Sequence, residues 1–350
     1  MRIYSCTCGN RLFFENSRCL NCQSEVAFCP RCRRLAPIEV QPDGLYLCGH
    51  ADCRAQVVKC DNYRRHQVCN RAVAWTSAAS RQHLCECCVY NEVIPDLSVP
   101  GNHGRWYRLE AAKRRLFYGL ELLSLLRSTW HSGPRLAFQF LADTEDPRRP
   151  GAAQRVVTGH CEGRITINIR EADDDERERL RVQFGEAQRT LIGHFRHEIA
   201  HYYWEVLVRG RSEGAFADVF GDHENPSYDE ALTRHYQSGP PADWPERHVS
   251  AYASMHPWED FAETFAAYLD MVCLLDSARD QGLGGGGAPQ ASLDTMLVDY
   301  QKIGIAMNEM NRSVGLVDLV PEVFVAPIIT KLRFVHELIR GASESGKLAG

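Results

Sequence analysis

The stretch Arg196-His-Glu-Ile-Ala-His-Tyr-Tyr-Trp204 contains the pattern His-Glu-x-x-His, in which two histidines are four residues apart. On an α-helix this spacing places both imidazoles on one face, one turn apart, where a single Zn²⁺ can accept both. The glutamate between them lies on the flank of that face, within reach of a proton on a metal-bound water. The pattern therefore predicts a helix that carries two zinc ligands, His197 and His201, and a general base, Glu198.

Two other interpretations of this helix stay open. Its histidines can also be packed and hydrogen-bonded side chains of an ordinary amphipathic helix. In addition, His194 precedes His201 by seven residues and shares its face, so it is a rival zinc ligand. The four-residue spacing favours His197 with His201.

A second stretch, Tyr252 to Phe265, offers a third ligand. A helix can begin at Pro257, because proline suits the first turn of a helix. Glu259 and Glu263 then lie four residues apart on one face of that helix. A catalytic zinc site needs a third protein ligand, which we predict to be Glu259, with Glu263 hydrogen-bonded to a ligating histidine. The alternative is a solvated acidic face, which is disfavoured by the apolar positions beside it: Phe261, Phe265, Tyr268 and Leu269.

These two motifs resemble those of the gluzincin metallopeptidases. More closely, the chain resembles a bacterial family of zinc-binding metallopeptidases whose members begin with a cysteine zinc ribbon. The resemblance covers most of the chain. It is carried by His197-Glu-x-x-His201 and Trp258-Glu-Asp-Phe-Ala-Glu263, and further by the stretches Glu110–Leu116, Thr158–His160, Ile165–Asn168, Glu171–Asp173, Gly193–His197 and His256–Asp260.

The resemblance implies roles for the matching residues. In related gluzincins the first Glu of the downstream helix binds zinc, the Glu four later supports a histidine ligand, and a Tyr seven residues before the ligand Glu stabilises the oxyanion. The corresponding residues here are Glu259, Glu263 and Tyr252. The implied fold is α+β, a zincin-like metallopeptidase domain that is mainly helical with a small sheet. The implied reaction is hydrolysis of peptide bonds in a peptide or protein substrate by a zinc-bound water that Glu198 activates.

Zincin folds also have a strand, just upstream of the metal helix, that lies along the cleft and pairs with an extended peptide. By resemblance and position we assign this role to residues 165–169. The stretch Ile165-Thr-Ile-Asn-Ile169 alternates strictly between apolar and polar residues. Such pairing requires an edge strand, whose backbone groups are available to a partner. His160 and Cys161 lie in the preceding turn and are more typical of structural residues than of ligands.

The N-terminal region is a second metal-binding unit. Thirteen of the 15 cysteines fall within the first 88 residues, at short spacings typical of zinc ligands. Four thiolates complete a zinc tetrahedron and exclude water, as structural sites require. We predict one such site from Cys6, Cys8, Cys19 and Cys22, a second from Cys29, Cys32, Cys48 and Cys53, and a third from Cys60, Cys69, Cys85 and Cys88. In the third site Cys87 can replace Cys88, and His50 or His83 can compete.

Charge bears on the partners of this cysteine module. Residues 1–95 carry 12 Lys and Arg against 8 Asp and Glu, a formal +4, within a chain of net charge −5. Twelve thiolates on three Zn²⁺ contribute a net −6, which brings the module to −2 and removes its basic character. A structural or protein-docking role is therefore favoured, and nucleic-acid binding is disfavoured. The alternative function for the whole chain is a multi-zinc protein- or nucleic-acid-interaction protein whose zincin-like domain binds without cutting.

The predicted organisation is a zinc-ribbon-type module over residues 1–95, a turn-rich linker over 96–105, and a catalytic domain with C-terminal helices over 106–350. One catalytic and two to three structural Zn²⁺ are expected. No apolar run is long enough to span a membrane, and the N-terminus lacks the apolar core of a signal peptide, so a cytoplasmic protein is expected. Helices are predicted over residues 106–127, 171–182, 190–207, 228–236, 293–310 and 327–339, and strands over 136–141, 155–158 and 164–170.

Overall fold

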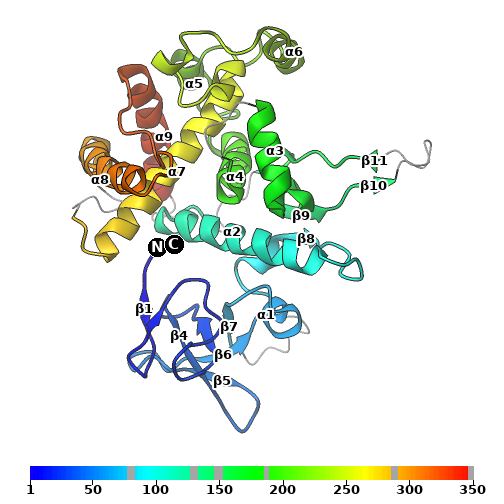
Figure 1. The fold of residues 1–350 in the computed structure, drawn as a ribbon, viewed down its shortest axis with the longest axis vertical. Coiled ribbons are helices and arrows are strands. Elements are labelled where there is room, and N and C mark those ends of the chain that lie inside the picture. The colour runs from blue at the N-terminus through cyan, green and yellow to red at the C-terminus, as the bar shows by residue number, and fades with distance from the viewer. Residues whose placement is uncertain (77–82, 127–132, 146–152, 185–188, 285–290, 346–350) are drawn as a thin grey trace. The chain divides into compact units, whose positions relative to one another are not determined.

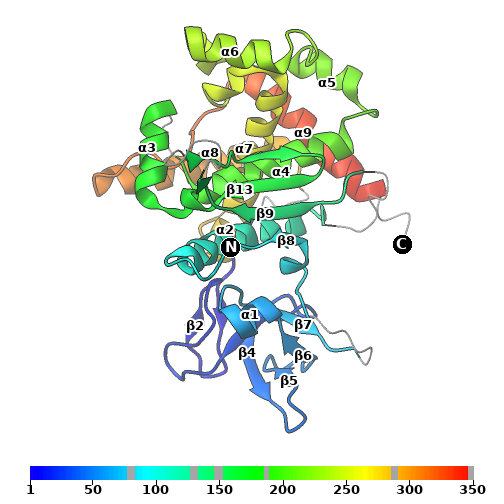
Figure 2. The same ribbon diagram turned by 90° about the vertical axis from the view of Figure 1, so that its right-hand side faces the viewer.

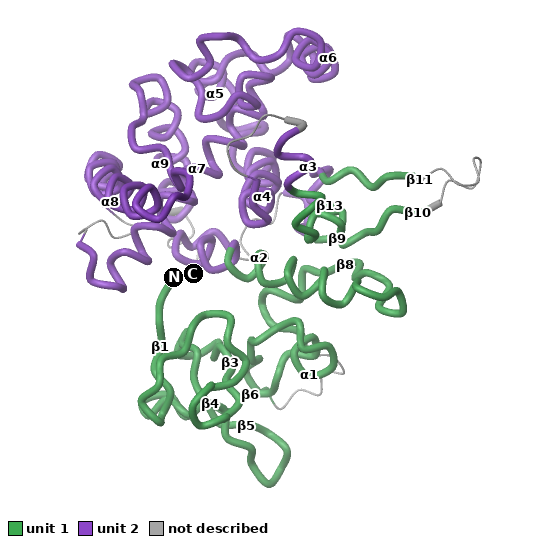
Figure 3. The backbone as a smooth tube through the Cα atoms, in the orientation of Figure 1, with its two compact units in different colours: residues 1–115, 137–158, 166–177 green, residues 116–136, 159–165, 178–350 purple. Residues whose placement is uncertain are grey.

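The computed structural model describes residues 1–76, 83–126, 133–145, 153–184, 189–284 and 291–345. The chain divides into two compact units (Figure 3). The first comprises residues 1–115, 137–158 and 166–177, and the second comprises 116–136, 159–165 and 178–350. This division differs from the predicted domains, because the boundary falls within helix α2 (Asn102–Leu122) and within strand β13 (Arg164–Asn168).

The first half of α2 belongs to the cysteine-rich unit because of its contacts there. Buried Trp106 packs against His66, with ring centroids 5.4 Å apart. Arg114, also buried, donates a hydrogen bond to the carbonyl of Val68 and pairs with Glu15 at 3.1 Å. The helix begins at Asn102, so the last four residues of the predicted linker, 102–105, are helical.

The cysteine-rich region is built from short antiparallel strands (Figure 1). β1 (Tyr4–Ser5) pairs with β2 (Arg11–Leu12). A five-stranded sheet follows in the order β3 (Val26–Phe28), β4 (Leu35–Val40), β5 (Tyr46–Cys48), β6 (Gln56–Lys59) and β7 (Ala72–Ala74). One short helix, α1 (Asp61–His66), lies between β6 and β7. The apolar core of this region is small, and its larger members are Leu12, Val26, Phe28, Leu35, Val57 and Tyr63.

A second sheet has the strand order β12-β13-β9-β8, in which β12 spans Gly159–Cys161, β9 spans Ala137–Leu141 and β8 spans Asn91–Val93. β9 confirms the strand predicted over 136–141, and it runs parallel to β8. The strand predicted over 155–158 is wrong. There the backbone bonds to side chains instead of a neighbouring strand, since Val156 donates to Asp143 at 2.8 Å and accepts from Asn168 at 3.0 Å. A short antiparallel pair, β10 (Thr144–Glu145) with β11 (Ala153–Gln154), follows β9.

Helices form most of the second unit (Figure 2). They are α4 (Leu191–Leu207), α5 (Glu213–Phe220), α6 (Tyr228–Ser238), α7 (Pro257–Asp280), α8 (Leu293–Ser313) and α9 (Ala326–Ser345), preceded by α3 (Asp174–Phe184), which starts in the first unit. α7 packs against α4, α8 and α9. The rings of Tyr203 on α4 and Phe265 on α7 stack 5.5 Å apart in the core of this unit. The prediction of an α+β chain that is mainly helical after its cysteine-rich region is confirmed.

Local sequence determines where these helices begin and end. Thr190 accepts the backbone N–H of Gly193 at 3.0 Å and thereby caps α4. His256 accepts the N–H of Trp258 at 3.1 Å at the start of α7, where Pro257 occupies the first turn. The last helix is longer than the predicted range 327–339, because α9 continues to Ser345.

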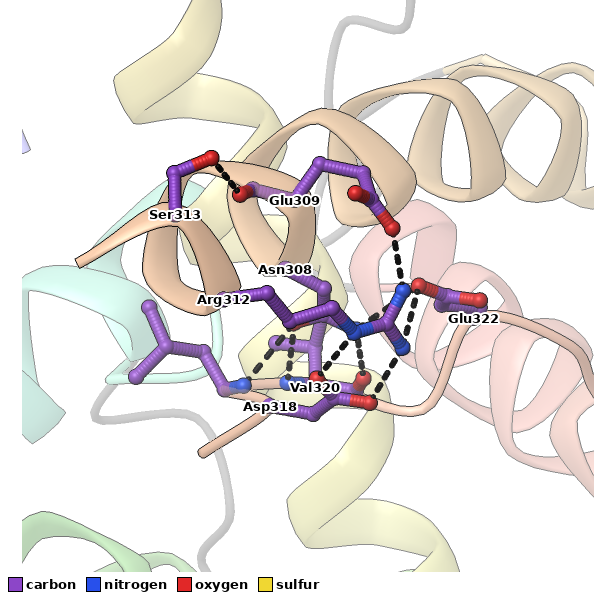
Figure 4. Close-up of polar contacts among 8 residues, drawn as sticks. Asn308, Glu309, Arg312, Ser313, Asp318, Val320 and Glu322 are labelled. Atoms are coloured by element: carbon purple, nitrogen blue, oxygen red, sulfur yellow. Dashed lines mark hydrogen bonds and ion pairs between the residues drawn. The ribbon is translucent and has the colours of Figure 1, made fainter. Parts of the chain in front are cut away.

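The connection between α8 and α9 is held by polar contacts (Figure 4). Buried Asn308 donates to the carbonyl of Val320 at 2.8 Å and accepts the N–H of Leu319 at 2.8 Å. Arg312 forms two hydrogen bonds to Asp318 and an ion pair with Glu322 at 3.2 Å. These contacts order the connection although many of its apolar side chains are exposed.

Candidate metal centre

Helix α4 carries both histidines of the His-Glu-x-x-His pattern on one face. The Nε2 atoms of His197 and His201 lie 3.1 Å apart, with His201 buried and His197 half-buried. The helix is fixed in the core by buried Phe195, Ile199 and Tyr203. The spacing in the sequence thus produces the convergence of the two imidazoles that was predicted from it.

Glu259 from α7 completes this group. Its Oε2 atom lies 3.0 Å from His197 Nε2 and 3.5 Å from His201 Nε2. Tetrahedral zinc with ligands at 2.0–2.1 Å requires donor atoms about 3.3 Å apart, which is the range of these three separations. Oε2 is buried and makes no hydrogen bond of good geometry within the described residues. Three donor atoms at these separations fit one zinc ion.

Glu263, one turn further along α7, orients His197. Its Oε1 lies 2.6 Å from His197 Nδ1, and its Oε2 accepts the hydroxyl of Ser250 at 2.7 Å. A carboxylate on Nδ1 keeps a proton there, so the lone pair of Nε2 faces the site of the metal. Burial opposes the charge of Glu259, but the attraction of His201 and the closeness of the two imidazoles hold the pKa of Glu259 well below its usual range. Glu259 is therefore ionised, as ligation requires.

Glu198 is buried on α4 beside His197. Burial raises the pKa of its carboxyl, against the opposing effect of His197 and His201. A carboxylate with a raised pKa is a stronger base near neutral pH, which suits proton transfer from water. His194, the rival ligand, is outside the group of donor atoms within 4.8 Å of one another, which consists of His197, His201 and Glu259.

His201 is also packed against aromatic rings. The ring of Trp258 lies 3.8 Å from it and that of His160 lies 6.4 Å from it. His160 accepts the N–H of Gly163 at 3.0 Å, and burial lowers its pKa to about 4. It is therefore a neutral packing residue next to the centre, and exposed Cys161 follows it in β12.

Two tyrosines lie close to His197 and Glu259. The ring of Tyr252, in the short helix Tyr252–Met255, is 6.0 Å from that of His197. The hydroxyl of Tyr228 donates a hydrogen bond to Glu259 Oε1 at 2.9 Å. Burial raises the pKa of both phenols, so both are hydrogen-bond donors. Sequence analysis missed Tyr228, because it lies 31 residues before Glu259 in the long connection between the motifs, where no spacing marks it.

The first two predicted cysteine groups assemble in the first unit. The sulfurs of Cys6 and Cys22 are 3.6 Å apart, and those of Cys8 and Cys19 are 3.7 Å apart. In the second group two sulfur pairs, Cys29 with Cys53 and Cys32 with Cys48, are each 3.8 Å apart. Zinc with four thiolates at about 2.3 Å requires sulfurs about 3.8 Å apart, so both groups fit the metal.

The third group consists of Cys60, Cys69, Cys85 and Cys88, all buried. Among the described residues its donor atoms include neither Cys87 nor a histidine. Cys87 is also buried, but its sulfur lies outside this group of donor atoms. The geometry thus selects Cys88 from the two alternatives. No disulfide is found among the cysteines, all of which are described.

Comparison with known proteins agrees with this arrangement. Residues 3–99 match a zinc-ribbon domain, and residues 102–338 match the family described as "Putative zinc-binding metallo-peptidase". The chain is thus a zinc-ribbon region followed by a peptidase-like domain. Because the second match covers more than half of its length, the chain belongs to that family, as the resemblance implied.

Its relatives include uncharacterized proteins of Mycobacterium bovis and of two strains of Mycobacterium tuberculosis. Each is 37% identical to this chain over 351 residues, an alignment that covers 97% of this chain and 95% of the relative. No solved structure matches the chain. Zinc is the metal that both the family and the three cysteine groups indicate. Within the described residues, every helix is too short or too polar to cross a membrane.

Proposed function

We propose that the protein is a zinc-dependent metallopeptidase of the gluzincin type, which hydrolyses peptide bonds. The observation that carries the proposal is the convergence of His197, His201 and Glu259 on one point, with Glu198 buried next to them. Zinc held there supplies a Lewis acid and lowers the pKa of water towards neutrality. Three protein ligands, rather than four, are typical of catalytic zinc and not of structural zinc.

Three side chains near the metal, Glu198, Tyr252 and Glu263, would have separate roles in the reaction. Glu198 takes a proton from the attacking water and later gives it to the leaving amine, which its raised pKa favours. Tyr252 donates a hydrogen bond to the oxyanion of the tetrahedral carbon, a contribution typically worth about 3 kcal/mol of barrier. Glu263 keeps His197 in the orientation that binding requires.

An extended peptide or a protein segment is the proposed substrate. The strand assigned to pair with it, residues 165–169, is wrong in one respect: β13 lies between β12 and β9 and is not an edge strand. The edge strands of this sheet are β12 and β8, and β12 is the one that packs against the metal helix α4. β12 therefore replaces β13 in the proposal, since only an edge strand has backbone groups available for a peptide.

The cysteine region is proposed to hold three structural zinc ions and to serve protein docking rather than nucleic-acid binding. Its twelve ligand thiolates offset its excess of Lys and Arg once zinc is bound. Cysteine groups that stay reduced belong to reducing compartments, so a cytoplasmic location is part of the proposal.

The test is the substitution Glu198→Gln, assayed with fluorescein-labelled casein and a quenched peptide library. Removing the base while keeping the shape should lower the rate by about 10²- to 10⁴-fold and leave the zinc content unchanged. The matched control is Glu246→Gln, at an exposed position, which should retain full activity. Undiminished hydrolysis by the Glu198→Gln protein would disprove the assignment.

A second candidate function is that of an interaction protein that does not cut. It is favoured by one observation: of the fifteen residues that form the four groups of donor atoms within the described residues, twelve lie in the cysteine region. Its signature would be that His197→Ala leaves the zinc content of the isolated protein unchanged.

A further inference from the structure

The two oxygens of the Glu259 carboxylate have different surroundings. Oε2 faces the imidazole nitrogens of His197 and His201, at 3.0 and 3.5 Å. Oε1 instead accepts a hydrogen bond from the hydroxyl of Tyr228 at 2.9 Å. A hydrogen bond to the second oxygen favours ligation of a metal through Oε2 alone and restrains rotation of the carboxylate plane.

Tyr228 is itself fixed in position. It is the first residue of α6, and the start of this helix is held by Glu230, which accepts the N–H and the hydroxyl of Ser227 at 3.0 and 2.8 Å. Its ring packs edge-on against His256 and Trp258, with centroids 5.4 and 5.8 Å away. His256 caps α7 and Trp258 immediately precedes Glu259, so the tyrosine is anchored to the turn that presents the ligand.

The hydroxyl of Tyr228 has a single hydrogen, which it donates to Glu259. It is therefore not available to donate to a substrate at the same time. This role is distinct from the contact with the oxyanion that is proposed for Tyr252.

We propose that Tyr228 is a positioning residue that holds Glu259 in one-oxygen ligation of the metal and ties helix α6 to the metal centre. The inference rests on the proposed zinc site, and it concerns retention of the metal rather than the chemical step. Hydrogen bonds to ligating residues typically contribute about 10- to 100-fold to metal affinity. Phenylalanine would keep the ring packing of Tyr228 and remove only the donor.

The test compares Tyr228→Phe with Tyr236→Phe, a tyrosine on the same helix that is 62% exposed. Zinc affinity is measured by chelator competition on the full chain. The His197→Ala protein shows the zinc binding of the cysteine sites alone, so the difference from the wild type is the zinc binding of this centre. We expect Tyr228→Phe to weaken binding at this centre by about 10- to 100-fold, and Tyr236→Phe to leave it unchanged. Cobalt(II) serves as a second probe. Subtracting the spectrum of the His197→Ala form of each protein leaves the cobalt spectrum of this centre. That spectrum should change in Tyr228→Phe and stay the same in Tyr236→Phe.

The outcomes separate this inference from the proposed function. If His197→Ala removes no zinc, the proposed centre itself fails. If His197→Ala removes one zinc but Tyr228→Phe keeps the affinity and the cobalt spectrum, only the inference is overturned. Lost hydrolysis with unchanged affinity would also overturn it, because the hydroxyl would then act on the substrate. Hydrolysis restored to Tyr228→Phe by saturating zinc would support it.

Discussion

Distances between single donor atoms decide which side chains can share a metal. Cys87 and Cys88 are neighbours in the sequence, both buried, and both at spacings compatible with a zinc ligand. Cys88 belongs to the group with Cys60, Cys69 and Cys85, whereas Cys87 lies outside it. The N–H of Cys88 also bonds to the sulfur of Cys85 at 3.4 Å, a contact that stabilises thiolate charge.

This difference predicts unequal effects of two matched substitutions. Cys88→Ser should lower the zinc content by about one ion per chain, because three thiolates cannot close the site. Cys87→Ser should keep the full zinc content. Elemental analysis of both proteins, purified without added metal, checks the prediction. Equal zinc in the two variants, or loss of zinc in Cys87→Ser alone, would contradict the assignment of Cys88.

At the scale of elements, the pairing of α4 with α7 brings ligands from distant parts of the chain together. Glu259 and Glu263 lie more than 50 residues from the histidines, and only the packing of the two helices places them in register. The stacked rings of Tyr203 and Phe265 form part of this contact. On its other side α7 packs against α9, where the hydroxyl of Tyr268 bonds to His336 Nδ1 at 2.8 Å.

The contact between α7 and α9 predicts a dependence of stability on pH. Burial, together with Arg340 and Arg333, lowers the pKa of His336, against the opposing charges of Glu337 and Asp294. An unfolded histidine binds its proton near pH 6.5, whereas folded His336 binds it only at lower pH. Between these values the unfolded chain holds more protons, so stability should fall as the pH drops below about 6.5.

The measurement is the free energy of unfolding in denaturant at pH 7.5 and pH 5.5, for the wild type and for His336→Gln. The loss of stability on acidification should be smaller in His336→Gln, and the part that this one group contributes should stay below about 1.4 kcal/mol per pH unit. An identical loss in the two proteins would rule out the contribution of His336.

At the scale of the whole molecule, metal and folding are coupled more strongly in the cysteine-rich region than in the helical unit. The strands of that region are two to six residues long, and its apolar core is small. A region of this kind depends on its metal sites for stability, since metal binding free energy becomes folding free energy. The helical unit has a continuous aromatic core of its own, for example Phe216, Phe261 and Phe265.

The four groups of donor atoms within the described residues predict the metal content of the molecule. Elemental analysis should find about four zinc ions per chain, and about three in His197→Ala, because each complete ligand set holds one ion. The thermal transition of the cysteine-rich region should disappear with a strong chelator. A count of about three in both proteins would mean that only the cysteine sites bind zinc.

The sequence by itself determined the local features of this protein. Residues four apart on a helix share a face, so the convergence of His197 with His201 follows from helical geometry alone. The short cysteine spacings define knuckles in the same way, and they led to three groups with one open choice. The predicted bounds of α4 and α6 lie within a few residues of the observed ones, and α7 begins at Pro257 as predicted from the preference of proline for the first turn.

Only the tertiary structure decided the features that depend on distant contacts. The choice of Cys88 over Cys87, the edge position of β12, and the contact of Tyr228 with Glu259 all join segments whose separation carries no periodic signal. The same holds for residues 155–158, where side chains of Asp143 and Asn168 replace a neighbouring strand. Periodicity reports only which side of an element is buried, whereas packing decides which partner it meets.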